Sequence, residues 1–290
     1  MRSLLELPPH IILKILQESS VENFPSIRLT CSLLDNYIVS YRSLLPPIEY
    51  YYCELSTSRC KLWQTRSSCT RYPLNDLSSL EMLHFTSFKV FSVIDIDEGL
   101  FNAVVDLIKN YGLRFDHLQL HNFNHRQIEI PLESVSNLLL IAKATGILFD
   151  VRSSNLTPEM FKLPGLVQCK TMSFEMDDSL VDVTQIHSPR IIVHQCDRIS
   201  TESIRRLLQD WVSGKSKLEC ARISSNQNIS FEEIFREMPM EHVQASGYVL
   251  TNVLGKKAYV TVRRNSYHFF ATIEATCNVE DVLYWKPIFE

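Results

Sequence analysis

The sequence predicts a mixed α/β protein that begins with a small group of helices. Three observations lead to this prediction. Apolar residues recur at helical spacing between residues 7 and 41, short apolar runs alternate with helical stretches from residue 85 onward, and β-branched and aromatic residues dominate after Gly247. We therefore expect three short helices, then an irregular series of strands and helices, then a C-terminal β meander, a class between α+β and α/β.

The first helix is predicted to open on a pair of prolines. Pro8 and Pro9 fit a first helical turn, where a missing N–H costs nothing, and Ser19 favours an end because its hydroxyl competes for backbone groups. The apolar positions between these limits form one stripe: Ile11, Ile12, Ile15 and Leu16. A second short turn follows Pro25. A third helix ends before Pro46 and carries its own apolar stripe: Leu33, Leu34, Tyr37, Ile38 and Tyr41.

Three helices of this size bury too little apolar surface to be stable alone, because small domains bury a smaller fraction of their surface. The segment therefore needs further apolar surface to pack on. A partner protein would supply that surface, and a larger core in the same chain would supply it equally well. The hydrophobic pattern alone leaves both open.

The composition describes an ordinary globular protein, with 45% hydrophobic and 21% charged residues. The net charge of -4 offers no electrostatic footprint for nucleic acid. Glu6 and the prolines after it interrupt any apolar leader, and the run Leu138–Ala142 is far shorter than a membrane span. The eight cysteines include no CxxC pair, so we interpret them as reduced thiols. We expect no nucleic acid and no membrane among the partners, and an intracellular protein of the cytoplasm, the nucleus or both.

Residues 47–84 show only weak periodicity. They contain three consecutive tyrosines, several serines and threonines, and Pro73. We predict a partly packed connector over this stretch.

From residue 85, short apolar runs recur about 20 to 32 residues apart, and several alternate as half-buried strands do. The runs are Phe88–Ile94, Phe115–Leu120, Ile147–Val151, Thr171–Met176, Arg190–Gln195 and Leu218–Ile223. Helical stripes around Phe101, Val135 and Ile204 fill three of the gaps, and the last should begin near Ser200 and end at Gly214. A strand and a helix at such intervals are typical of a leucine-rich-repeat-like solenoid. The irregular spacing leaves a non-repetitive α/β domain as the alternative.

After Gly247 the sequence favours antiparallel strands. Three segments are rich in β-branched and aromatic residues, with turn residues between them: Tyr248–Leu254, Ala258–Arg263 and Tyr267–Ile273. We predict a meander over residues 243–275 that caps the C-terminal end of the domain.

Residues 7–38 resemble an F-box, with which they align without a gap. That family begins with Leu-Pro, here Leu7–Pro8, and has an Ile-Leu pair eight residues on, here Ile15–Leu16. A Leu-Arg-Leu-type run with a small residue or Cys comes later, here Ile27–Cys31. The Arg-Leu-Thr-Cys sequence within this run is similar to the version found in nematode F-box proteins.

The chain departs from that pattern at Ser19, where leucine is usual, and at Leu34, where many members have tryptophan. The resemblance implies a domain at residues 1–46 that docks on the Skp adaptor, and through it on a cullin, by burying apolar helix faces. The contact residues that it implies are Leu7, Pro8, Ile11, Ile12, Ile15, Leu16, Phe24 and Leu29. Some of them must hold the helices together instead, and the sequence does not separate the two groups.

The second half of the chain carries a resemblance of its own. Ile204–Leu218, which contains Trp211, is similar to the Phe-Leu-Lys-x-Trp-x-x-Gly-x-x-x-Leu core of the F-box-associated domain of nematode proteins. Val262–Ile273 is similar to the closing stretch of that domain, although the Asp-Gly turn is missing. The resemblance implies a substrate-binding domain over residues 85–290. Its two parts would be a repeat-like region, 85–240, and the meander, 243–275.

The sequence gives no sign of a catalytic or cofactor site. It contains no glycine-rich phosphate loop and no GxSxG nucleophile elbow. His117, His121 and His125 are four residues apart and would share one face of a helix, a spacing that suits a metal ion. The strand predicted at Phe115–Leu120 separates them, so we interpret them as structural or solvated histidines. We expect no metal, no cofactor and no enzymatic activity.

Together the two resemblances imply a substrate-recognition adaptor of an SCF-type cullin-RING ubiquitin ligase, which tethers a target and catalyses nothing itself. Its partners would be the Skp adaptor, the cullin bound to it and an unknown protein substrate. One alternative is a scaffold that docks through its F-box without promoting degradation. A more remote alternative is a small α/β enzyme, which a convergent polar pocket with shifted pKa values would reveal.

Overall fold

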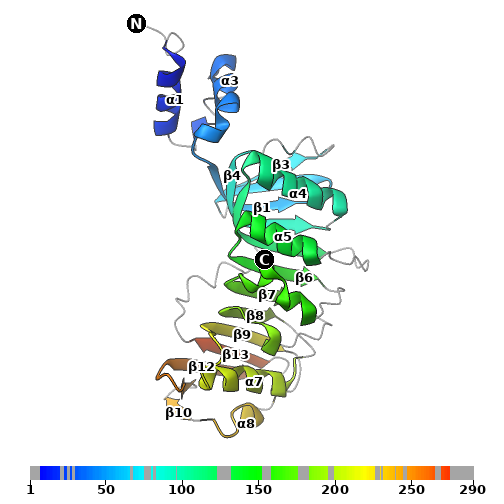
Figure 1. Ribbon diagram of the computed structural model, residues 1–290, viewed down its shortest axis with the longest axis vertical. Coiled ribbons are helices and arrows are strands. Elements are labelled where there is room, and N and C mark those ends of the chain that lie inside the picture. Colours follow the sequence, from blue (N-terminus) through cyan, green and yellow to red (C-terminus); the bar gives the residue numbers. More distant parts are fainter. Residues whose placement is uncertain are drawn as a thin grey trace. The chain divides into compact units, whose positions relative to one another are not determined.

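The computed structural model of the chain divides into two units (Figure 1). The first comprises Met1–Phe91 and Glu98–Phe115, and the second Ser92–Asp97 and Asp116–Glu290. The structure describes residues 7–19, 23–24, 27, 30–65, 68–74, 80, 83–95, 97–122, 132–151, 158–175, 183–194, 199–225, 229, 231–238, 240–243, 247–264 and 269–274.

The first unit opens with residues 7–45, which we call the helical segment. It contains α1 (Pro9–Glu18), α3 (Ser32–Ser40) and the 3₁₀ turn η3 (Arg42–Leu44). The first and third predicted helices are therefore confirmed. The second predicted turn, after Pro25, lies largely outside the described residues.

Four strands follow, in the order β3-β2-β1-β4. They are β1 (Ile48–Leu55), β2 (Arg59–Thr65), β3 (Ser68–Pro73) and β4 (Thr86–Ile94). The first three pair antiparallel, so residues 47–84, for which we predicted a connector, contain a folded meander. Cys53 and Leu62 are buried on one face, whereas Glu54 and Trp63 belong to the other. Because tyrosine, tryptophan and a buried glutamate occupy that other face, apolar and polar residues do not alternate cleanly, and the pattern hides the strands.

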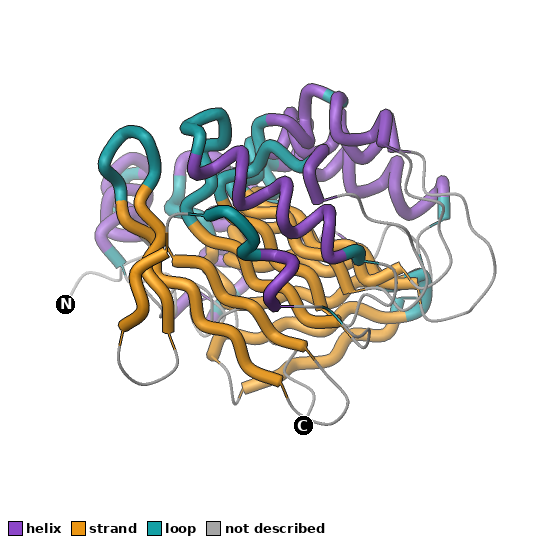
Figure 2. The backbone as a smooth tube through the Cα atoms, turned by 90° about the horizontal axis from the view of Figure 1, so that it is seen from below, coloured by secondary structure: helices purple, strands orange, loops and turns teal. Residues whose placement is uncertain are grey.

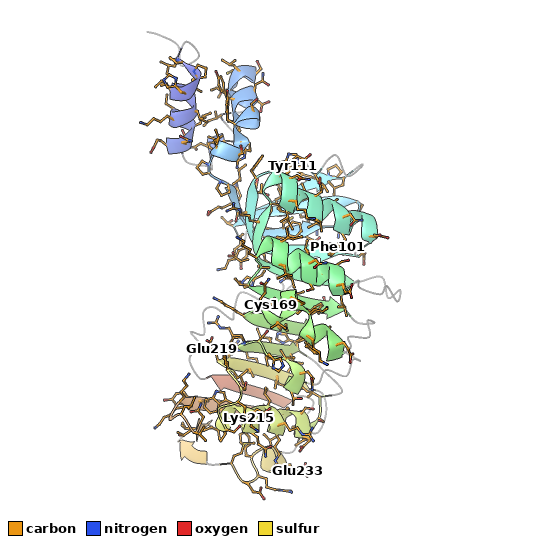
Figure 3. All side chains as sticks on the ribbon, viewed as in Figure 1. Phe101, Tyr111, Cys169, Lys215, Glu219 and Glu233 are labelled. Carbon is orange, nitrogen blue, oxygen red and sulfur yellow. The ribbon has the colours of Figure 1, made fainter. Side chains whose placement is uncertain are left out.

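The first unit also contains α4 (Glu98–Tyr111), whose buried residues recur at helical spacing close to the predicted stripe. Phe101, one of these buried residues, and Tyr111 are both labelled on this helix in Figure 3. The ring of His84 stacks on that of Tyr111 with centroids 3.9 Å apart, and the Phe85 N–H donates to the Tyr111 carbonyl at 2.6 Å. The end of α4 is thereby fixed to the chain just before β4.

Parallel strands form one half of the second unit. They are β5 (Arg114–Asn122), β6 (Gly146–Val151), β7 (Thr171–Glu175), β8 (Arg190–His194) and β9 (Cys220–Ser225). Each strand pairs in parallel with the next one along the chain. Together with β4 they confirm all six predicted strands to within a few residues at each end, and the mixed α/β class is confirmed with them.

Helical connections join these strands. They are α5 (Leu132–Ala142), η5 (Pro158–Lys162) with α6 (Pro164–Val167), η6 (Val183–Gln185) and α7 (Thr201–Val212). They lie on one side of the strands of this unit (Figure 2). The Ser200 hydroxyl accepts a hydrogen bond from the Ser203 N–H at 3.0 Å, and Gly214 has φ +75°, so α7 begins and ends where predicted.

Antiparallel strands form the other half of the second unit. The elements are α8 (Phe231–Ile234), β10 (Met240–Val243), β11 (Gly247–Thr251), β12 (Lys257–Arg264) and β13 (Phe269–Glu274). Their order is β10-β11-β12-β13-β9, so the closing strand of the meander pairs with the last parallel strand. The predicted meander is confirmed, and β10 is an additional strand that the sequence pattern did not reveal.

Aromatic packing marks the core of the second unit. Phe149 of β6 and Phe174 of β7 lie side by side on these paired strands, and their rings stack with centroids 5.7 Å apart. Phe161 of η5 meets Phe174 edge-on at 6.0 Å. Gln119 of β5 and Ser173 of β7 are each one residue away from a strand position that points into this core, so their side chains point to the opposite face. The strands therefore direct apolar side chains to one face and several polar side chains to the other.

Candidate docking surface

Local hydrogen bonds define both ends of α1. The Pro8 carbonyl accepts from the N–H groups of Ile11 at 2.9 Å and Ile12 at 3.2 Å, so the helix starts there without a side-chain cap. At the other end the Ser19 hydroxyl donates to the Ile15 carbonyl at 2.7 Å, as its predicted competition for backbone groups requires. The helix between these ends has 10 residues and carries apolar side chains on more than one face.

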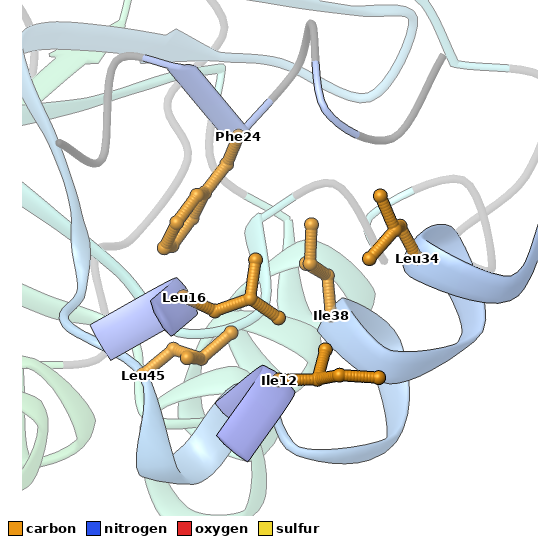
Figure 4. Packing of buried hydrophobic residues seen from close by; sticks show 6 residues of the cluster. All are labelled: Ile12, Leu16, Phe24, Leu34, Ile38 and Leu45. Carbon is orange, nitrogen blue, oxygen red and sulfur yellow. The ribbon is translucent and has the colours of Figure 1, made fainter. Parts of the chain in front are cut away.

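The helical segment has a core of its own (Figure 4). Its members are Ile12, Leu16, Phe24, Leu34, Ile38 and Leu45. Each of them is at most 7% exposed. Leu34, which departs from the F-box pattern, is therefore a core residue in this chain.

The structure places three of the eight predicted contact residues in that core. Ile12, Leu16 and Phe24 are 0 to 3% exposed and pack on one another (Figure 4). Their side chains have little surface left to offer to a partner. Leu29, a fourth predicted contact, lies outside the described residues.

The remaining four predicted contacts stay accessible to different degrees. Pro8 is exposed and Ile15 is 39% exposed, whereas Leu7 and Ile11 are half-buried. Pro8, Ile11 and Ile15 are three and four residues apart, so they share one face of α1. This face lies one position out of phase with the buried pair Ile12 and Leu16.

Three exposed apolar residues were not among the predicted contacts. Leu33 is 40%, Tyr41 38% and Leu44 56% exposed, and the ring of Tyr37 stacks on that of Tyr41 with centroids 5.7 Å apart. These four residues recur every three or four positions along α3 and η3, which places them on one side. The sequence contains the signal as a second apolar stripe, one residue out of phase with the buried one.

The end of α1 contacts η3. The Gln17 side-chain amide donates to the Leu44 carbonyl at 3.1 Å. The exposed faces of α1 and of α3 with η3 therefore belong to elements that touch. We define the docking surface as Pro8, Ile11, Ile15, Leu33, Tyr41 and Leu44.

Arg42 fixes the helical segment to the strands of the same unit. Although it is only 7% exposed, its guanidinium donates from Nη1 to the Pro46 carbonyl at 2.8 Å and from Nη2 to the Phe85 carbonyl at 3.0 Å. The guanidinium carbon lies 5.6 Å from the centre of the Phe24 ring. One buried cation thus joins the core of the helical segment to the chain that leads into β1 and β4, and the docking surface rests on a fixed base.

Two of the three histidines considered as metal ligands, His117 and His121, lie on β5. His121 Nδ1 is 2.6 Å from an Asp150 carboxylate oxygen, and its Nε2 is 3.3 Å from the Gln119 side-chain oxygen. The third, His125, lies outside the described residues. Within the described ranges no three His, Cys, Asp or Glu side chains are grouped to hold a metal ion. No helix in those ranges has both the length and the apolar character needed to cross a bilayer.

No family model matches the chain, and neither the curated proteins nor the solved structures contain a significant match to it. Function is therefore inferred from the fold and from the docking surface.

Proposed function

We propose that the helical segment is an F-box that docks on a Skp adaptor, and that the protein recruits a target to an SCF-type cullin-RING ubiquitin ligase. The observation that carries this proposal is the docking surface. A small helical segment closes its own core and still leaves Ile15, Leu33 and Leu44 39 to 56% exposed. Exposed apolar side chains gathered on one small segment are typical of an interaction site. The resemblance of residues 7–38 to an F-box then supports a particular partner.

The core residues and the docking surface have separate roles in this proposal. Ile12, Leu16 and Phe24 hold the helices in place, while the exposed side chains contact the adaptor. Covering a half-exposed aliphatic or aromatic side chain contributes roughly 1 kcal/mol. Part of the free energy gained from all these contacts offsets the translational and rotational entropy that both partners lose on association. We expect Tyr41 to be the main anchor, because tyrosine is enriched at hot spots. Leu44 should add the largest aliphatic contact, since at 56% it is the most exposed of the large apolar side chains that the structure describes in this segment.

The proposed mechanism is tethering. The adaptor and cullin hold the enzyme that carries ubiquitin, and this chain holds the target. A lysine of the target then meets that enzyme at a high effective concentration. Proximity of this kind contributes several kcal/mol to a reaction without any catalytic residue in the tethering chain. The fixed base that Arg42 provides suits this role because it holds the helical segment on the strands of the first unit.

The second unit would hold the target. Parallel strands in chain order, joined by helical connections on one side, support a leucine-rich-repeat-like arrangement. The connections vary from the 3-residue η6 to the 12-residue α7, so any such repeat is irregular. The resemblance of Ile204–Leu218 to the F-box-associated domain adds support, since α7 buries Trp211 and the Trp211 indole N–H donates to the Leu218 carbonyl at 3.0 Å.

Co-purification of the full chain with a Skp adaptor tests the docking proposal. The double variant Ile15→Asp, Leu44→Asp places two charges on the docking surface while leaving the core residues unchanged. We expect it to lower the affinity by a factor on the order of 100 or more, because a carboxylate that loses water without gaining a partner costs several kcal/mol.

Leu140→Asp is the matched control. Leu140 is also a leucine on a helix, it has the same 39% exposure as Ile15, and it belongs to the second unit. This variant should bind the adaptor as the wild type does. A well-folded wild type that forms no complex, or a double variant that binds like the wild type, contradicts the proposal. A complex that forms but changes no partner's turnover indicates the non-degradative scaffold instead.

A further inference from the structure

One hairpin of the second unit carries the most exposed large apolar side chains of the described residues. Val253 is 69%, Leu254 68% and Tyr259 61% exposed. Val253 and Leu254 are the adjacent residues at the tip between β11 and β12, and Tyr259 is on β12. We call residues 252–257 the β11–β12 turn.

Hydrogen bonds hold this turn in one conformation. The Asn252 side-chain oxygen accepts from the N–H groups of Leu254 at 3.0 Å and Lys256 at 2.8 Å, and the Asn252 N–H donates to the Lys256 carbonyl at 2.9 Å. The Val253 N–H donates to the Val212 carbonyl at the end of α7, also at 2.9 Å. The two exposed aliphatic side chains are therefore presented by a rigid turn, which lowers the conformational entropy that binding would cost.

Lysines surround the turn. Lys256 and Lys257 are exposed within it, and Lys215, labelled in Figure 3, follows Gly214, whose α-carbon lies close to the Val253 side chain. The two segments that meet here, residues 210–217 and 251–257, contain four lysines and a single acid, Asp210, although the whole chain has a net charge of -4. The tip thus combines apolar side chains with a local positive charge in an acidic protein.

We propose that the β11–β12 turn attaches the protein to an anionic lipid surface, with Val253 and Leu254 entering the headgroup layer and Lys215, Lys256 and Lys257 facing the lipid anions. Aliphatic side chains flanked by cations are the combination by which interfacial anchors bind such membranes. The cations are all lysines, which are depleted in protein–protein interfaces. Neither segment contains arginine, and their one tryptophan, Trp211, is buried at 2% exposure, so the exposed tip offers none of the tryptophan or arginine typical of protein hot spots. These features favour a membrane over a protein partner.

The strength expected is modest. Each lysine near an anionic surface raises the partition coefficient about fivefold, and each aliphatic side chain that leaves water raises it about tenfold. Three lysines and two aliphatic side chains together multiply the partition coefficient by a factor on the order of 10⁴. This inference goes beyond the proposed docking function, does not depend on it, and departs from our expectation that no membrane is a partner.

Co-sedimentation of the full chain with lipid vesicles tests the inference. We expect binding to phosphatidylcholine vesicles that contain about one third phosphatidylserine, no binding to phosphatidylcholine alone, and weaker binding at high salt. The double variant Val253→Asp, Leu254→Asp should lose at least tenfold in binding, and Lys256→Gln about fivefold. Each variant should keep the melting temperature of the wild type, because the replaced side chains are exposed.

Val167→Asp is the matched control. Val167 is a 50% exposed valine of α6 in the same unit. The variant protein should bind vesicles as the wild type does. The inference is overturned if the wild type does not sediment with the phosphatidylserine vesicles, as a protein partner for this turn would predict. It is also overturned if the double aspartate variant sediments like the wild type.

Discussion

The helical segment and the parallel strands of the second unit differ in how completely they bury their apolar side chains. In the second unit each strand directs alternate apolar residues to one face, and Leu118, Phe149 and Phe174 there are completely buried. In the helical segment α1 buries Ile12 and Leu16 but leaves the neighbouring Ile15 39% exposed. The parallel strands bury their apolar side chains within the second unit, whereas the helical segment leaves some of its own exposed.

Size explains this difference. A long series of strands with helices on one side closes a continuous core, because each added strand and connection covers the one before it. A segment of a few short helices has too little volume to cover every apolar side chain. Exposed apolar surface is therefore most informative about function where the core is smallest. Substitutions can separate the residues that form a core from the residues that do not.

Phe174→Ala should have the largest effect on stability. Its ring is completely buried between Phe149 and Phe161, and removing it leaves a cavity that the stiff sheet does not close. We expect the free energy of unfolding to fall by roughly 3–5 kcal/mol, measured by urea denaturation. Val167→Ala, at an exposed position, should change it by less than about 0.5 kcal/mol. Similar losses in both variants would contradict a close-packed core.

Leu16→Ala should cost less, roughly 2–3 kcal/mol, because the small core of the helical segment collapses more easily around the gap. The loss should appear as weaker protection of the α1 amides in hydrogen exchange, with the protection of β6 and β7 unchanged. Ile15→Ala, one residue away but 39% exposed, is the control and should leave α1 protection nearly intact. Equal effects of both variants would remove the distinction between core and docking surface.

Alkaline pH should weaken the buried cores by about 1.4 kcal/mol at pH 10 for each of two buried thiols. Burial raises the pKa of the Cys169 thiol from 9.0 to about 12, and burial together with the hydrogen bond to Cys60 raises that of Cys53 well above 9.0. Above pH 9 the unfolded chain therefore loses protons that the native thiols keep. Stability is complete below pH 9 and falls as the pH rises towards 12, by at most about 1.4 kcal/mol per unit for each thiol.

Urea denaturation at pH 8 and pH 10 measures this decline. Cys169→Ala should be less stable at pH 8, because it loses packing, yet its stability should fall less between the two values. An unchanged slope in this variant would show that Cys169 is not the source.

Ser200→Ala should have the smallest effect of this series that remains measurable. The Ser200 hydroxyl caps α7 by accepting from the Ser203 N–H, and its loss should cost about 1 kcal/mol. Ser200→Asp, which retains an acceptor at the positive end of the helix, should recover most of it in the same thermal-unfolding measurement. A loss as large in the aspartate variant would argue against capping.

Much of the fold was predictable because its elements follow simple periodicities. The runs around Leu118, Phe149 and Phe174 alternate as half-buried strands do, and the stripe that ends at Trp211 has helical spacing between a serine cap and a glycine. The meander of β1 to β3 was missed because aromatic and charged residues share one of its faces, as Tyr52 and Glu54 do. Which strand pairs with which is a long-range choice, so the pairing of β13 with β9 was not predictable from local pattern.

The candidate site was predictable only in outline. Ile11 and Ile12, like Ile15 and Leu16, are adjacent and chemically alike, yet one of each pair enters the core and the other stays accessible. On a helix such neighbours differ by about 100° of rotation, and only the position of α3 decides which direction is inward. The sequence therefore locates the segment, and packing assigns its residues to core or surface.

Arg42 has a mechanical consequence. Its guanidinium ties the Pro46 carbonyl to that of Phe85 and lies over the Phe24 ring, so the short link between η3 and β1 has little freedom to swing. A torque applied to α1 and α3 is transmitted to β1 rather than absorbed at a hinge. A partner that binds the helices and moves them therefore also moves the strands of the first unit.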